Sequence, residues 1–157
     1  MRTSKRSTKK PAAKQLRILH LDDDKTVTSY YQRVLRDPEF GFEMQVELIT
    51  TPEEFLERIE YDKQWNAVVL DVMMPHPDWT HFDHGQSDDG LLTGALLLEP
   101  LRQHLPDVPV VFLTNRPGDD FKKLVKDKSI PVLLKHDYPP MEFAEYLRDF
   151  ISKTKTK

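Results

Sequence analysis

The chain has 157 residues, of which 38% are hydrophobic, and this length suits one domain with a single core. It contains no cysteine, which excludes disulfide scaffolds, thiolate metal clusters and cysteine nucleophiles. No apolar run approaches the length of a membrane-spanning helix, so we expect a cytoplasmic protein that does not contact a membrane.

The net charge of −3 hides an uneven distribution along the chain. Residues 1–14 carry six bases and no acid, whereas residues 15–152 hold all 26 acids and 14 of the 23 bases. A tail of lysine, serine and threonine without an apolar stretch is typical of a solvated extension. We therefore expect basic tails at 1–15 and 153–157 around one domain at 16–152, and we do not expect nucleic-acid binding.

Along this domain, short apolar runs alternate with longer amphipathic ones, which predicts β-α units around a parallel sheet. Residues 17–22 predict a first strand and 26–36 a helix. Residues 42–48 alternate in polarity, as an edge strand would. Thr51 can cap the next helix, and Pro52 suits its first turn.

In the second half, residues 66–71 are apolar on both faces, which is typical of a central strand. Residues 91–105 predict a helix that Pro100 should kink or divide. The remaining predicted elements are strands at 109–114 and 130–135 and helices at 119–128 and from Pro140 onward. Five strands and five helices in alternation predict an α/β fold of three layers, a doubly wound sheet of five parallel strands.

Polar residues follow the predicted strands. The first strand ends in Asp22, Asp23 and Asp24, the third in Asp71, the fourth in Thr114 and the fifth in Lys135. Open parallel sheets bind ligands outside the carboxyl ends of their strands. Clustered carboxylates repel one another unless a cation such as Mg²⁺ lies among them, and a lysine and a hydroxyl opposite could hold a phosphoryl group.

This residue set, with the stretch Leu70-Asp71-Val72-Met73-Met74-Pro75, resembles the receiver domain of two-component response regulators over about residues 16–152. The resemblance implies a flavodoxin-like strand order of 2-1-3-4-5. It also implies a phosphoprotein of phosphorelay signal transduction, in which Asp71 accepts a phosphoryl group from a phosphohistidine. Such a receiver is a signalling protein whose only catalysis is its own phosphorylation and dephosphorylation.

The resemblance assigns roles to individual residues. Asp22, Asp23, the Asp71 carboxylate and the Met73 backbone carbonyl would bind Mg²⁺. Lys135 would pair with the phosphoryl oxygens, and Thr114 would reorient to bond them. The implied partners are a sensor histidine kinase or histidine phosphotransfer protein and a downstream effector protein, and homodimerisation is possible. About five residues follow the last predicted helix, so we expect a stand-alone receiver.

Three positions depart from the family pattern. Asn115 replaces the usual small residue after the threonine, Val132 replaces the switch aromatic, and His136 replaces the proline that usually follows the lysine. These replacements put in question the coupling between the threonine, here Thr114, and the switch aromatic that is usual in the family. A receiver-like binding module that is not phosphorylated therefore remains an alternative.

The loop after Asp71 is longer than the family pattern, with an insertion at about 75–87 before Asp89-Gly90, which looks like the start of the third helix. Within it, His81, Asp83 and His84 have the chemistry of metal ligands. A second metal site is one interpretation of this segment. A polar surface loop beside the acidic pocket is the other.

A phosphohydrolase of the haloacid-dehalogenase type is the alternative from another class. Leu21-Asp22-Asp23-Asp24-Lys25-Thr26-Val27 matches its Asp-x-Asp-x-Thr signature, with Asp22 as nucleophile and Asp24 as general acid and base. That hypothesis gives Asp71 no role. His20, inside the first strand, is expected to be a buried packing residue and not a catalyst.

Overall fold

A computed structural model describes residues 14–74, 93–115, 119–125 and 129–155 of the chain. The strands are β1 (Arg17–Leu21), β2 (Gln45–Ile49), β3 (Ala67–Leu70), β4 (Val110–Thr114) and β5 (Val132–Leu134). The α-helices are α1 (Lys25–Arg36), α2 (Pro52–Tyr61), α4 (Thr93–Leu96), α5 (Leu98–His104), α6 (Asp119–Leu124) and α7 (Pro140–Thr154), and a 3₁₀ turn, η1, covers Pro38–Phe40.

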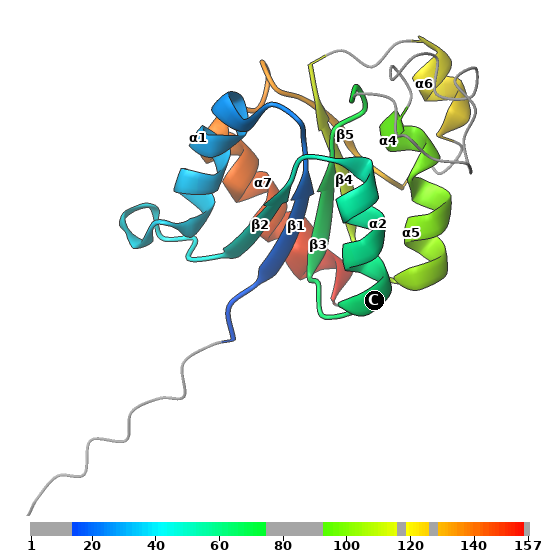
Figure 1. The fold of residues 1–157 in the computed structure, drawn as a ribbon. Helices are drawn as coiled ribbons and strands as arrows, with labels where there is room; N and C mark the ends of the chain where they lie inside the picture. Colours follow the sequence, from blue (N-terminus) through cyan, green and yellow to red (C-terminus); the bar gives the residue numbers. More distant parts are fainter. Residues whose placement is uncertain (1–13, 75–92, 116–118, 126–128, 156–157) are drawn as a thin grey trace, which may run out of the picture.

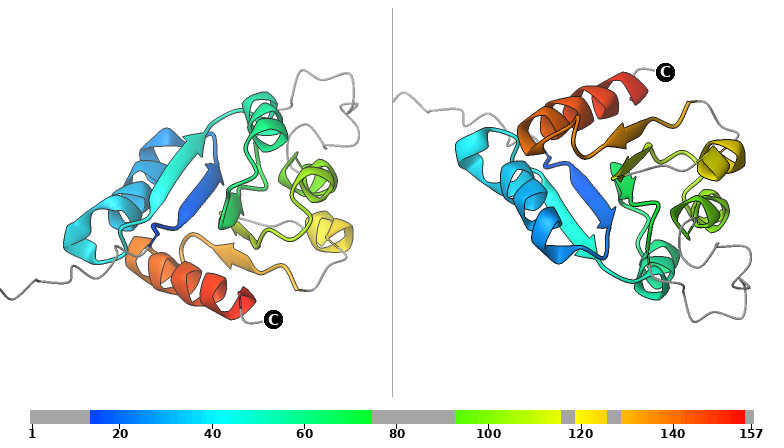
Figure 2. Two further views of the ribbon diagram at one scale, coloured as in Figure 1. Left: turned by 90° about the horizontal axis from the view of Figure 1, so that it is seen from below. Right: turned by 90° about the horizontal axis from the view of Figure 1, so that it is seen from above.

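The strands form one parallel sheet in the order β2-β1-β3-β4-β5 (Figure 1), which confirms the predicted fold class. Helices α1 and α7 cover one face, and α2, α5 and α6 cover the other (Figure 2). Alternate residues of β1 enter the two cores, since Ile18 packs with the α1 and α7 side and Leu19 with the opposite side. The chain therefore forms three layers, with the sheet buried between two layers of helices.

Local signals set several element boundaries as predicted. The Thr51 hydroxyl accepts the Glu54 backbone N–H at the start of α2, with Pro52 in the first turn. The predicted helix at 91–105 divides at Leu97 into α4 and α5. Pro100 explains the division, because it has no N–H to donate to the carbonyl four residues earlier and its ring crowds that carbonyl.

Two strands begin two or more residues later than predicted. The edge strand begins at Gln45 and not at Phe42, because Glu43 has a left-handed φ of 49° and the Met44 N–H bonds the Leu35 carbonyl at the end of α1. β5 covers only Val132–Leu134. The helix predicted at 119–128 ends at Leu124.

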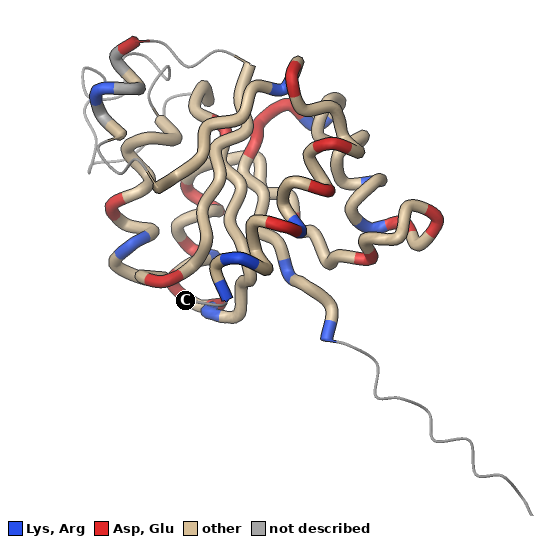
Figure 3. The backbone as a smooth tube through the Cα atoms, turned by 180° about the vertical axis from the view of Figure 1, so that it is seen from behind, with Lys and Arg blue, Asp and Glu red and all other residues tan. Residues whose placement is uncertain are grey.

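Charged residues lie mainly on the helices and the connections, and the central strands carry few of them (Figure 3). Within the part of the chain that the structure describes, no helix combines the length and apolarity needed to cross a bilayer. The insertion at 75–87, the Asp89-Gly90 pair and the proposed ligands His81, Asp83 and His84 lie outside the described residues, as do residues 1–13.

Candidate functional site

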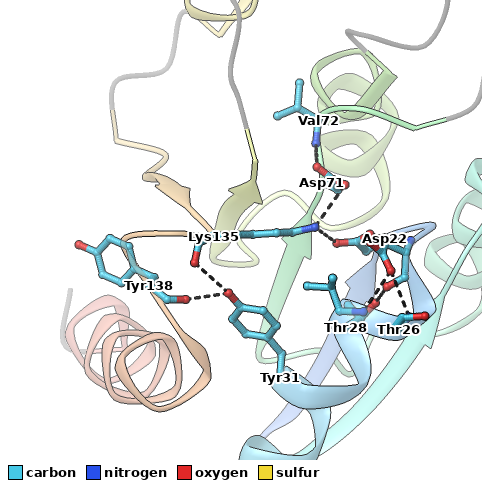
Figure 4. A network of polar contacts seen from close by, with 10 residues as sticks. Asp22, Thr26, Thr28, Tyr31, Asp71, Val72, Lys135 and Tyr138 are labelled. Carbon is cyan, nitrogen blue, oxygen red and sulfur yellow. Dashed lines mark hydrogen bonds and ion pairs between the residues drawn. The ribbon is translucent and has the colours of Figure 1, made fainter.

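The predicted site residues meet at one edge of the sheet, where β1, β3, β4 and β5 end (Figure 4). Asp22 and Thr114 are fully buried, and Asp71 and Lys135 are 5% and 8% exposed. Parallel strands place all their carboxyl ends at the same edge, so residues far apart in sequence become neighbours here.

Three carboxylates converge at this edge. Asp22, Asp23 and Asp71 each offer an oxygen within 4.8 Å of the others. Asp23 is exposed, so the cluster opens to solvent on one side. Partial burial and the negative charge of Asp22 nevertheless raise the pKa of Asp23.

Lys135 lies against two of these carboxylates. Its Nζ is 2.7 Å from Asp22 Oδ2 and 3.7 Å from Asp71 Oδ2. The contact with Asp22 Oδ2 is a short ion pair, and Asp22 Oδ1 accepts the Asp24 N–H at 2.9 Å. Burial alone lowers the pKa of Lys135, but the Asp71 charge and the contact with Asp22 outweigh it and raise that pKa. The lysine is therefore a fixed positive charge.

Asp71 is the most perturbed carboxylate of the cluster. Burial and the Asp22 charge raise its pKa to about 6, although Lys135 and the Val72 N–H act in the opposite direction. The Val72 N–H donates to Asp71 Oδ1 at 2.7 Å and fixes the carboxylate plane. The Thr114 hydroxyl makes no hydrogen bond of standard geometry to a described residue, yet it lies close enough to Asp71 to favour its ionised form.

The donor set suits a hard divalent cation. One lysine faces three carboxylates, which leaves an excess of negative charge, and carboxylate oxygens are the ligands that Mg²⁺ prefers. The cluster could therefore hold a metal ion. Met73, the predicted backbone ligand, is 40% exposed beside Asp71, and its role stays a prediction.

Asp24 does not join the cluster. Its carboxylate caps α1 by accepting the backbone N–H groups of Thr26 and Val27, at 3.1 and 3.0 Å. The structure thus gives Asp24 a structural task and not the acid-base position that the phosphohydrolase hypothesis needs.

The other predicted residues take peripheral positions. His20 is fully buried, as expected, and burial lowers its pKa to about 4, so the ring is neutral at physiological pH. Asn115 is exposed beyond Thr114, and Val132 is 36% exposed on β5. His136 is exposed and lies 3.3 Å from Asp137.

Two residues that matter here were not singled out from the sequence. Gly94, inside the helix predicted at 91–105, lies so close to the end of β3 that an added Cβ would overlap the Asp71 carbonyl oxygen. Tyr31, inside the helix predicted at 26–36, donates its hydroxyl hydrogen to the Lys135 and Tyr138 carbonyls. The sequence offered only weak signals for them. Gly94 lies near the start of one predicted helix, and Tyr31 lies on the apolar face of another.

Sequence comparison alone does not place the chain, because no family profile and no curated protein matches it. Comparison of structures identifies its fold. A receiver domain protein (CheY-like) from Methanospirillum hungatei JF-1 matches with a TM-score of 0.70 at 19% identity, covering 91% of this chain and 98% of that one. The chain has the response regulator receiver fold.

Two further structures with the receiver fold are similar to this chain. The signal receiver domain of an HD domain-containing protein from Pseudomonas fluorescens Pf-5 has a TM-score of 0.69 at 16% identity, covering 92% of this chain and all of that one. A response regulator from Burkholderia pseudomallei, with a phosphorylated aspartic acid, a calcium ion and citrate, has a TM-score of 0.60 at 18% identity, covering 90% and 72%.

Proposed function

We propose that this protein is a phosphoacceptor receiver, in which Asp71 takes a phosphoryl group from a phosphohistidine and the signal passes on by protein contacts. The observation that supports the proposal is the convergence of Asp22, Asp23 and Asp71 within 4.8 Å, with the Lys135 ammonium against two of them. A structural role for these residues does not explain why three acids and one base gather at the carboxyl ends of the strands.

The reaction is a nucleophilic displacement by a carboxylate. An Asp71 oxygen forms a bond to phosphorus while the bond between phosphorus and the donor's imidazole nitrogen breaks, and that electron pair leaves with the imidazole. Lys135 pairs with the phosphoryl oxygens, and the Thr114 hydroxyl, which lacks a standard hydrogen bond to a described residue, turns to bond one of them.

Asp22, Asp23, Asp71 and the Met73 carbonyl would hold Mg²⁺, which would neutralise charge as a dianionic group approaches three carboxylates. The proposed partners are a sensor histidine kinase or a histidine phosphotransfer protein upstream and an effector protein downstream. A cytoplasmic location follows from this function, because the phosphohistidine is made from ATP.

The proposal is tested by Mg²⁺-dependent labelling with acetyl phosphate. We expect one phosphoryl group on the wild type and none on Asp71→Asn, which keeps the shape of the side chain but removes the nucleophile. Asp107→Asn, an exposed acid beyond the opposite edge of the sheet, is the matched control and should label like the wild type. Intact mass and mapping of the adduct measure the result. Label retained in Asp71→Asn, or found on Asp22, would refute the assignment.

A further inference from the structure

We propose that Tyr31 is a positioning residue for Lys135, and that its hydroxyl links the pocket to the aromatic side chains that run from the turn before α7 along that helix. This inference rests on the proposed function. Among the described residues, the Tyr31 hydroxyl bonds the Lys135 and Tyr138 carbonyls, so its effect on the pocket would pass through the Lys135 backbone.

The contacts of Tyr31 bridge three elements. Its ring comes from α1, is 3% exposed, and packs edge to face on Phe143 of α7 with the ring centroids 5.5 Å apart. Its hydroxyl reaches the Lys135 carbonyl at 3.2 Å and the Tyr138 carbonyl at 2.8 Å (Figure 4). A phenol has a single proton, so the two carbonyls share it, with the shorter contact at Tyr138.

The hydroxyl completes the anchoring of the Lys135 backbone. On one side the Lys135 N–H donates to the Thr114 carbonyl at 2.9 Å, and on the other side the Lys135 carbonyl accepts from Tyr31. With both backbone groups held, the side chain extends to Asp22 and Asp71. Because burial raises the pKa of Tyr31, the phenol keeps the proton that this contact requires.

The same hydroxyl contacts the turn that leads into α7. The Tyr138 ring lies edge to face on Tyr146, which stacks on Phe150. Val132 on β5 has no ring to respond to a movement of Thr114. A shift of Lys135 toward a phosphoryl group would instead move the Lys135 carbonyl that the Tyr31 hydroxyl bonds. Through Tyr31, it would also change the position of the turn at Tyr138.

The test compares Tyr31→Phe with Tyr30→Phe. Both remove one phenolic oxygen from α1, but Tyr30 is 63% exposed whereas Tyr31 is buried. Beryllofluoride in the presence of Mg²⁺ serves as the probe of phosphoryl binding, because Lys135 would contact the bound group. From the usual strength of one hydrogen bond we expect Tyr31→Phe to bind beryllofluoride about 3- to 10-fold more weakly. Its affinity for Mg²⁺ alone should not fall, since the carboxylates are intact.

Backbone amide NMR provides the second measurement. At saturating beryllofluoride, the signals of Val72 and Tyr146 should both move in the wild type and in Tyr30→Phe. In Tyr31→Phe, the signal of Val72 should still move and that of Tyr146 should move less. Equal beryllofluoride affinity in the two variants, or a parallel loss of Mg²⁺ affinity in Tyr31→Phe, would overturn the inference. If the wild type itself binds no beryllofluoride, the proposed function fails instead.

Discussion

The two ends of strand β1 each carry an ion pair, and the pairs differ in how their charges are balanced. At the amino end, Arg17 holds Asp62 through two contacts of 2.8 and 3.2 Å, and the guanidinium also lies 4.3 Å from the centroid of the Trp65 ring. At the carboxyl end, Lys135 faces three carboxylates. One base meets one acid at the first edge, and one base meets three acids at the second.

The pKa values of the acids follow this difference. The hydrogen bonds from Arg17 lower the pKa of Asp62, so its negative charge is stabilised where it lies. Burial and the neighbouring acid raise the pKa of Asp71 to about 6. The amino-end pair is therefore balanced in charge, whereas the carboxyl-end cluster has an excess of negative charge that a bound cation would offset.

The largest effect is expected from Lys135→Met, which removes the only base of the carboxyl-end cluster among the described residues. Without divalent ions, the free energy of unfolding should fall by about 3 kcal/mol, because loss of one partner leaves buried charge uncompensated. Urea denaturation measures it. Mg²⁺ should restore part of the loss.

Lys63→Met is the matched control for this experiment. Lys63 is exposed and donates to the Ile59 carbonyl at the end of α2, away from the acids. Its loss should change the free energy of unfolding by about 0.5 kcal/mol or less, with or without Mg²⁺. Equal stability of the two variants in the absence of divalent ions would show that the carboxyl-end cluster is not strained.

An effect of opposite sign and no greater size is expected from Asp71→Asn. The folded protein keeps the Asp71 proton up to about pH 6, whereas the unfolded chain loses it near the ordinary pKa of 3.8. The unfolded state therefore binds fewer protons between these values, and stability falls as the pH rises through this range. Above pH 7 without divalent ions, Asp71→Asn should be more stable than the wild type by up to about 3 kcal/mol.

That gain should shrink as the pH falls toward 4, since the wild-type carboxyl then becomes neutral as well. Mg²⁺ should stabilise the wild type and reduce the difference at high pH, because the variant has one carboxylate fewer to bind it. Thermal unfolding over a pH series, with and without Mg²⁺, measures both effects. A variant that is less stable than the wild type at every pH would contradict the assigned pKa.

The smallest effect is expected at the other end of β1. Asp62→Asn removes one charge from the pair with Arg17, whose side chains are each 26% exposed, and should cost about 1 kcal/mol or less. High salt should diminish the cost, and Mg²⁺ affinity and phosphorylation should stay at wild-type values. An altered Mg²⁺ affinity would mean that the two ends of the strand are coupled.

The parts of the fold that depend on local chemistry could be predicted from the sequence. Thr51 and Pro52 start a helix because their preferences act within one turn, and Pro100 divides a helix for the same reason. The pocket could be predicted as well, because a parallel sheet brings Asp71 and Lys135 to one edge whatever lies between them.

Other features depend on contacts that no local pattern carries. Asp22, Asp23 and Asp24 are chemically alike, and only the path of the backbone after β1 makes one a buried partner of Lys135, one an exposed member of the cluster and one a helix cap. Tyr31 lies 104 residues from Lys135 in sequence, and its helical spacing indicates only that it faces a core.

The close approach of α4 to β3 has a further consequence for the long connection between them. The Thr93 hydroxyl donates to the Met74 carbonyl at 3.3 Å, and the Gly94 N–H donates to the Val72 carbonyl at 3.0 Å. The fold itself thus holds together the two points between which residues 75–92 run. Closing a longer loop across a fixed gap costs only about 0.6 kcal/mol per doubling of its length. Connections of different length should therefore fit between Met74 and Thr93 at little cost in stability, while the sheet keeps its register.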